Sequence, residues 1–147
     1  MQFKTIGPGT PESIWLYVVN GHTAALAKDT WVAYAFASGN RDGAKVVPIT
    51  LASNGNMPAG VVTESIPVGD KGYIAVWGVY PTAMCVGGAT TAELLPGGLM
   101  QVKTNGGSAE TMGATGVSCG VFLEPTYTAA AGSSATPFHA RVLVRCL

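Results

Sequence analysis

The stretch AGVVTESIPVGDKGYIAVWGVYPTAMCVGG, from Ala59 to Gly88, decides the fold class of this chain. Its apolar runs are short, at most about six residues, and are bounded by glycine, proline or aspartate. This pattern is typical of tightly connected antiparallel strands. Few side chains in the stretch could take part in chemistry. The sequence therefore predicts several short strands here, each with a turn residue on at least one side: Val61–Val62, Ile66–Val68, Tyr73–Trp77, Val79–Tyr80 and Met84–Val86.

The rest of the chain repeats this pattern of apolar runs and turn residues. Ile14–Val19 ends at Asn20-Gly21, and we expect a strand there rather than a helix opened by Thr10 and Pro11. Further strands are expected over Thr30–Phe36, Val46–Leu51, Leu99–Lys103, Gly116–Leu123 and Ala140–Cys146. The fold class predicted is all-β: a compact antiparallel β-sandwich or barrel.

The expected domain organisation is simple. Residues 1–20 form an extended N-terminal arm and the first strand, because Gly7-Pro8-Gly9 cannot continue a regular element. Residues 21–147 form a single β domain, with a flexible stretch at Thr126–Pro137.

Composition and charge exclude several classes of partner. Charged residues make up 11% of the chain, and eight basic residues balance eight acidic ones, so no basic stripe for nucleic acid is expected. No apolar run approaches the roughly 20 residues that span a bilayer, and the first ten residues do not resemble a signal peptide. A neutral, charge-poor surface gives little protection against association, which favours a protein that works inside an assembly.

The three cysteines, Cys85, Cys119 and Cys146, follow no metal-ligand spacing and cannot all pair within one chain. We expect free thiols buried among apolar side chains, with no metal and no cofactor. His22 and His139 also lack a carboxylate or cysteine at ligand spacing. We therefore expect each histidine to lie at the surface or to make a hydrogen bond.

No catalytic constellation is predicted, so the chain is not expected to be an enzyme. Gly116-Val117-Ser118-Cys119-Gly120 matches the G-x-S-x-G pattern, but a nucleophile elbow needs a helix after the serine and a strand is predicted there. A small hydrolase with a dispersed catalytic site is the least favoured of the three functions considered for this chain. A glycosidase would need two converging carboxylates. The spacing predicts none among the scattered acidic residues Glu64, Asp70, Glu93, Glu110 and Glu124.

Aromatic residues leave a second function open. Trp15, Trp31 and Trp77, together with five tyrosines, could stack against sugar rings, although aromatic residues along strands usually belong to the core. A carbohydrate- or receptor-binding β module, of a phage tail fibre or of lectin type, is therefore kept as the alternative.

The block that decides the fold also resembles a known family. Ala59–Val62, Ile66–Gly69 and Gly72–Gly78 are similar to the core motif of capsid decoration (cement) proteins of tailed bacteriophages. Pro96–Val102 is similar to the segment that follows in the family, and Gly120–Leu123 and Arg141–Cys146 to its last two strands. The resemblance covers about two thirds of the chain, from about Thr30 onward.

The resemblance implies a structural virion protein on the outer surface of a phage head, made in the host cytoplasm. Its partners would be the assembled major capsid protein and other copies of itself, as a homotrimer, with no nucleic acid and no membrane. Binding only the assembled lattice would stabilise that lattice by mass action. Strand edges and an N-terminal arm suit such contacts, since extended segments can add to a neighbour's sheet. The family has no catalytic residues, so none is expected here.

Overall fold

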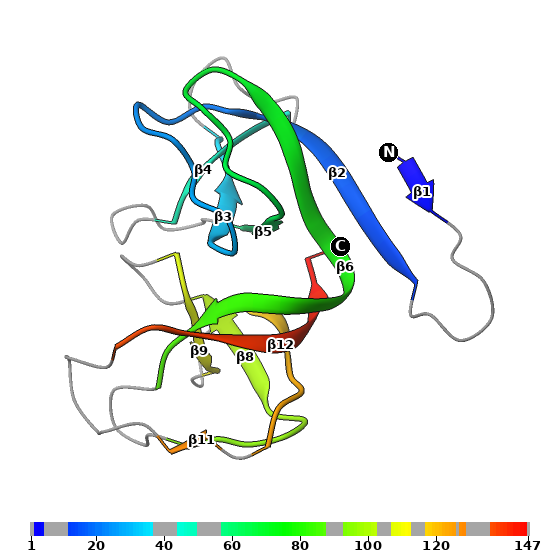
Figure 1. The fold of residues 1–147 in the computed structure, drawn as a ribbon, viewed down its shortest axis with the longest axis vertical. Helices are drawn as coiled ribbons and strands as arrows, with labels where there is room; N and C mark the ends of the chain where they lie inside the picture. Colours follow the sequence, from blue (N-terminus) through cyan, green and yellow to red (C-terminus); the bar gives the residue numbers. More distant parts are fainter. Residues whose placement is uncertain are drawn as a thin grey trace.

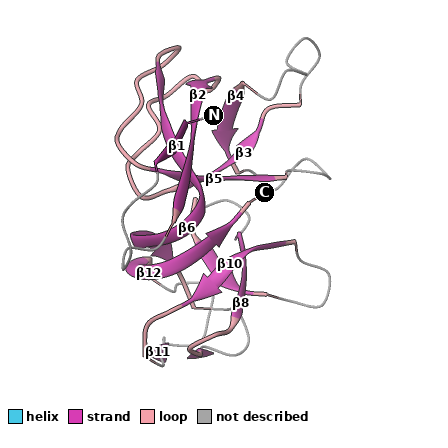
Figure 2. Cartoon of the chain, turned by 90° about the vertical axis from the view of Figure 1, so that its right-hand side faces the viewer, coloured by secondary structure: helices cyan, strands magenta, loops and turns pink. Residues whose placement is uncertain are grey.

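A computed structural model of the chain describes residues 2–4, 12–36, 44–49, 57–87, 93–102, 107–112, 117–125, 127–128 and 136–146. These residues form strands and no helix (Figure 2), which confirms the all-β prediction. None of them belongs to a helix that could cross a membrane. The strands are β1 (Gln2–Lys4), β2 (Ser13–Asn20), β3 (Trp31–Tyr34), β4 (Lys45–Pro48), β5 (Pro58–Val62), β6 (Lys71–Cys85), β7 (Glu93–Leu94), β8 (Leu99–Val102), β9 (Ala109–Thr111), β10 (Ser118–Phe122), β11 (Tyr127–Thr128) and β12 (Phe138–Arg145).

The 15-residue strand β6 is the central strand of the fold. Its first half pairs with β2 on one side and β5 on the other, and its second half pairs with β12 and, at Cys85, with β9. Figure 1 shows β6 running from the upper part of the protein into the lower part. A single strand therefore belongs to both halves of the fold.

The sheet closes on itself twice, and both closures include β6. The pairings β2–β4, β4–β3, β3–β5, β5–β6 and β6–β2 form a first circuit, and we call this half the upper lobe. The pairings β6–β12, β12–β10, β10–β8, β8–β9 and β9–β6 form a second circuit, the lower lobe (Figure 1). Barrel-like closure is thus the form that the predicted sandwich or barrel takes. Most pairings are antiparallel, but β2–β4 and β6–β9 are short parallel contacts.

Each lobe has its own apolar core, and β3 serves both. Alternation sends Val32 of β3 into the upper core and its neighbours Trp31 and Ala33 into the lower one. The upper core is composed of Val18, Leu26, Val32, Val46, Ala59, Val62, Ile66, Ile74 and Val76. The lower core contains Trp31, Tyr80, Met100, Phe122, Val142, Val144 and all three cysteines, among others.

The predicted breaks in β6 are wrong, and the structure explains why. Gly78 does not end the strand; it adopts a positive φ of 104° where β2 stops pairing and β12 begins. A Cβ at this position would collide with the carbonyl oxygen of Glu12 and lie 2.8 Å from Cα of Ser13. Pro81 is accommodated because the β6–β12 register shifts beside it, and proline is tolerated at a β-bulge.

Other predicted strands changed less. Ile14–Val19 is a strand as expected, while Ile66 makes only an isolated bridge with Leu26. The start of the predicted arm is not free: β1 pairs with the edge of β2, with Gln2 opposite Trp15 and Lys4 opposite Ser13. Residues 5–11 of the arm and residues 129–135 of the predicted flexible stretch lie outside the described residues.

Candidate functional site

Ser118 does not occupy a nucleophile elbow. It is the first residue of β10, pairs with Gln101 of β8, and is followed by residues that continue the same strand to Phe122. Gly120 of the motif is needed for packing, because a Cβ there would lie 2.6 Å from the carbonyl oxygen of Leu143. The G-x-S-x-G match is therefore a strand sequence in this fold.

Asp29 organises the most developed polar cluster among the described residues. It has a positive φ of 68°, is almost fully buried, and accepts hydrogen bonds at Oδ1 from the hydroxyls of Tyr80 and Thr82, both at 2.8 Å. Oδ2 lies 3.6 Å from Nδ1 of His139, and the same nitrogen lies 2.9 Å from the carbonyl oxygen of Thr82. Since a carbonyl only accepts, Nδ1 of His139 carries a proton in this arrangement.

The contacts of this cluster link a loop and two strands of the same chain. Burial, followed by the hydrogen bond and the charge of Asp29, raises the pKa of Tyr80 far above its usual value, so its hydroxyl stays protonated. The backbone of Asp29 also donates to Val62 and accepts from Met84. Both carboxylate oxygens thus face groups that fix the loop before β3 against β6 and β12.

Sequence reasoning expected His139 to be exposed or hydrogen-bonded, and the structure confirms this. It missed the approach of His139 to Asp29, because the two residues are far apart in the chain and only the β6–β12 pairing brings them together. His22 lies beside a second buried polar residue that links distant segments: the backbone N–H of His22 donates to Oδ1 of Asn20. Nδ2 of Asn20 donates to carbonyl oxygens of Ala24, Ile66 and Pro67.

The acidic residues singled out from the sequence do not converge in the described structure. Glu64 and Asp70 are exposed in the segment between β5 and β6, and the side chain of Glu93 lies outside the description. Glu110 accepts from Nε2 of Gln101 at 3.0 Å, and Glu124 lies 3.6 Å from Nε of Arg141. No group of three potential metal ligands occurs among the described residues.

The three thiols are free and buried in the lower core. Burial raises the pKa of Cys85 to about 12 and that of Cys146 to about 12, and it raises the pKa of Cys119 further. A thiol must lose its proton to act as a nucleophile or a metal ligand. These side chains therefore behave as small apolar groups at neutral pH.

The tryptophans divide between core and surface. Trp31 is fully buried and donates from Nε1 to the carbonyl oxygen of Met84 at 3.0 Å. Trp77 is half-buried beneath the guanidinium of Arg145, 5.7 Å from its ring centroid. Trp15 is exposed together with Tyr17 and the half-buried Tyr73, and we call these three residues the aromatic face.

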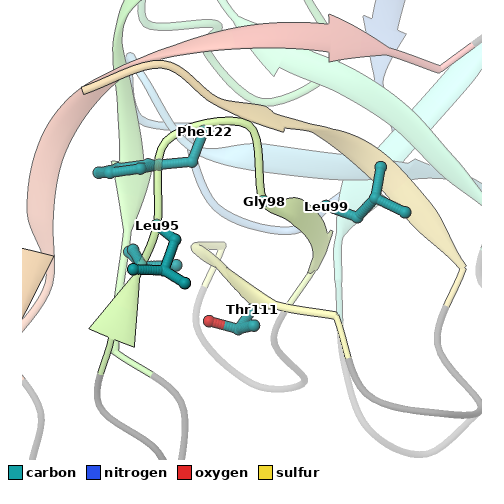
Figure 3. Close-up of a pocket in the computed structure, with 6 residues that line it drawn as sticks. Leu95, Gly98, Leu99, Thr111 and Phe122 are labelled. Carbon is teal, nitrogen blue, oxygen red and sulfur yellow. The ribbon is translucent and has the colours of Figure 1, made fainter. Parts of the chain in front are cut away.

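A small apolar pocket opens in the lower lobe at the turn between β7 and β8 (Figure 3). Its volume is about 90 Å³, enough for one apolar side chain. Leu95 and Leu99 at the pocket are about half exposed, at 51% and 44%. The residues that line it are Leu94, Leu95, Gly98, Leu99, Thr111 and Phe122.

No protein-family model matches the sequence, and no curated protein matches it either. A search of solved structures gives the crystal structure of the N base of head fiber gp8.5 in bacteriophage phi29. That chain is 12% identical, with a TM-score of 0.49, and the alignment covers 89% of this chain and 94% of that one. A likeness at this level carries no conclusion about the activity or partners of the present protein.

Proposed function

We propose that this chain is a structural virion protein that decorates and stabilises a tailed-phage capsid by binding the assembled major capsid lattice. The similarity of Ala59–Val102 to capsid decoration proteins carries this proposal. That block contains all of β5 except Pro58, together with β6, β7 and β8. Its glycines have physical tasks, since a Cβ on Gly60 would collide with the carbonyl oxygen of Ala75 and one on Gly78 with that of Glu12.

The polar groups of the protein support a structural role. Two of the buried polar residues, Asn20 and Asp29, direct their side-chain hydrogen bonds at loops and strands of the same chain. The raised pKa values of the buried thiols keep the cysteines protonated. We therefore propose that the protein is not an enzyme and needs no cofactor.

We propose the apolar pocket of the lower lobe as the contact with the capsid. Leu95 and Leu99 expose apolar surface beside a cavity that an apolar side chain of the major capsid protein would fill. Burying such a side chain contributes roughly 1.5–3 kcal/mol. When the free concentration of the protein is about 100 times its Kd for the lattice, binding stabilises the lattice by about 2.7 kcal/mol at each site. The protein would act as a homotrimer on the outer surface of the head.

The test is co-sedimentation of the purified protein with expanded heads that lack it. Wild-type protein should sediment with the heads, and decorated heads should retain DNA to a higher temperature than bare ones. Leu99→Asp should weaken binding at least tenfold, because a charge would enter the apolar contact. Val117→Asp is the matched control, since Val117 is 62% exposed and does not line the pocket. Protein that stays in the supernatant and is absent from virions would overturn the proposal.

A carbohydrate- or receptor-binding module remains the second candidate, and one observation favours it. Of the three tryptophans, Trp31 is buried in the core, whereas Trp15 lies at the surface beside two tyrosines. Glycan binding without any association with heads would favour this candidate over decoration.

A further inference from the structure

The aromatic face lies on the outer side of β2 and β6 in the upper lobe. Tyr17 is directly opposite Tyr73 in the β2–β6 register, with ring centroids 4.9 Å apart and planes at 47°. Trp15, two residues before Tyr17 on β2, lies diagonally from Tyr73, with ring centroids 6.4 Å apart and planes at 56°. The three rings therefore form one continuous row across two paired strands, which run side by side in Figure 1.

Strand alternation explains why these rings are at the surface. Leu16 and Val18 of β2 pack against or within the upper core, so Trp15 and Tyr17, which alternate with them, point the other way. Trp15 is 37% exposed and Tyr17 is 54% exposed. The fold would be satisfied by polar residues at these positions, as is usual on the outer side of a half-buried strand.

The exposed area of the aromatic face matches a small ligand and is well below one side of a standard protein interface. An aromatic side chain has roughly 150–250 Å² of surface to bury, so the exposed parts of three partly covered rings total on the order of 250 Å². Each side of a standard protein interface needs about 800 Å². The other large exposed apolar side chains, such as Phe36, Leu95 and Val117, belong to different elements and do not extend the row.

The residues directly opposite the three rings carry no charge, and the charged residues next along the strands are all basic. Gln2 and Ala75 lie opposite Trp15, and Tyr17 and Tyr73 lie opposite each other. Lys4 lies opposite Ser13, and Lys45 and Lys71 both lie opposite Val19, which argues against a cationic ligand. What the face does offer is ring surface edged by hydrogen-bonding groups: two phenolic hydroxyls and one indole N–H. Aromatic residues of this kind suit a ligand that is apolar on one side and hydroxylated at its rim.

We propose that the aromatic face binds an oligosaccharide of hexopyranose units, a function beyond capsid decoration. The C–H face of a pyranose ring would stack on the aromatic rings while its hydroxyls meet the tyrosine O–H and indole N–H groups and water. Trp15 and Tyr17 are two residues apart on one strand, so their Cα atoms are about 7 Å apart. The row therefore accommodates a short run of two or three sugar units rather than a single one.

The test uses the purified full chain and defined neutral sugars: cellohexaose, chitohexaose, maltohexaose and a galactan hexasaccharide. Tryptophan fluorescence and calorimetric titration should detect binding of at least one of them, with a Kd of about 0.1–1 mM. Trp15→Ala and Tyr17→Ala should each weaken that binding about tenfold, since an aromatic contact contributes up to about one decade in affinity.

Phe36→Ala is the matched control, because Phe36 is 55% exposed but follows β3 and pairs its ring with Tyr34 instead of the aromatic face. It should bind sugar like the wild type, and circular dichroism should show that all three variants are folded. Failure of every hexasaccharide to bind, or equal binding by wild type and both variants of the aromatic face, would overturn the proposal. So would self-association of the wild type that Trp15→Ala abolishes, because the aromatic face would then be a protein contact. None of these outcomes bears on capsid binding, which is measured separately with heads.

Discussion

The side chain of Trp31 should be among the most costly in this protein to truncate. The side chain of Trp31 is fully buried, and the next residue of the same strand, Val32, belongs to the upper core. Its ring extends into the lower lobe: a Cβ on Gly120 of β10 would lie 3.5 Å from Cη2 of the indole. Nε1 also donates to Met84 of β6. One residue thus joins β3 to strands of the second circuit.

The magnitude follows from these contacts. Replacing a buried tryptophan by alanine costs about 3–5 kcal/mol, through lost burial and the cavity left behind. Trp31→Phe keeps an aromatic ring but leaves the Met84 carbonyl without its indole donor, which should cost about 1–3 kcal/mol. Against a total stability of about 5–15 kcal/mol, Trp31→Ala would remove a large fraction of the free energy of unfolding.

The assay is urea unfolding followed by far-ultraviolet circular dichroism and by intrinsic fluorescence. Wild-type protein should unfold in one transition with both probes, because β6 is shared by the two lobes. Trp15→Ala, at the surface, should lose less than about 1 kcal/mol and serves as the control. A loss below about 1 kcal/mol for Trp31→Ala, or separate transitions for two lobes in the wild type, would refute this account of how the lobes are joined.

Three further predictions follow from single features. Gly78→Ala should cost about 2 kcal/mol or more in urea unfolding, because it adds a steric collision to an unfavourable φ, whereas Gly69→Ala, with open space around it, should cost about 1 kcal/mol. Burial raises the pKa of Cys85 from 9.0 to about 12, so the stability that its protonated thiol provides is complete below pH 9 and is lost as pH rises toward 12. The urea midpoint should therefore fall more steeply between pH 9 and 10.5 in the wild type than in Cys85→Ala, and equal slopes would contradict the assignment. Deleting residues 1–10 should leave the β spectrum intact, because β1 lies outside both circuits, and should weaken head binding or trimerisation; an unfolded product would show that β1 is part of the core.

The strands could be predicted where sequence-local rules decide them. Asn20 and Gly21 close β2 as expected, and the strand predicted over Thr30–Phe36 contains β3. Burial of Cys85 and Cys119 also followed from the apolar runs that contain them. In each case the relevant physical cause lies within a few residues of the position predicted.

Features that depend on distant pairings could not be predicted. Gly78 and Pro81 look like strand ends when only their neighbours are considered, but β2, β12 and a register shift accommodate them. Asn20 was assigned to a turn, whereas its side chain also holds a segment 46 residues away, at Ile66. Asp29 and His139 became partners only through the pairing of β6 with β12.

Closure of both circuits limits how this protein can bind a partner. A strand that is paired on both sides cannot accept another, and among the described strands only β1, β7 and β11 are paired on one side alone. These strands have two or three residues each, so strand addition, which the sequence favoured, has little room outside β1. Outside β1, contacts are therefore expected to come from side chains on the outer surfaces.

The two outer surfaces with the means to make such contacts belong to different lobes. The apolar pocket lies in the lower lobe between β7 and β8, and the aromatic face lies in the upper lobe on β2 and β6. A molecule held on a capsid through Leu95 and Leu99 would therefore keep Trp15 and Tyr17 available for a second ligand. Because neither set of residues contacts the other's strands in the β-sheet register, the two proposed interactions can be lost separately by substitution. Decoration and sugar binding are thus compatible in one chain, and each has its own physical basis.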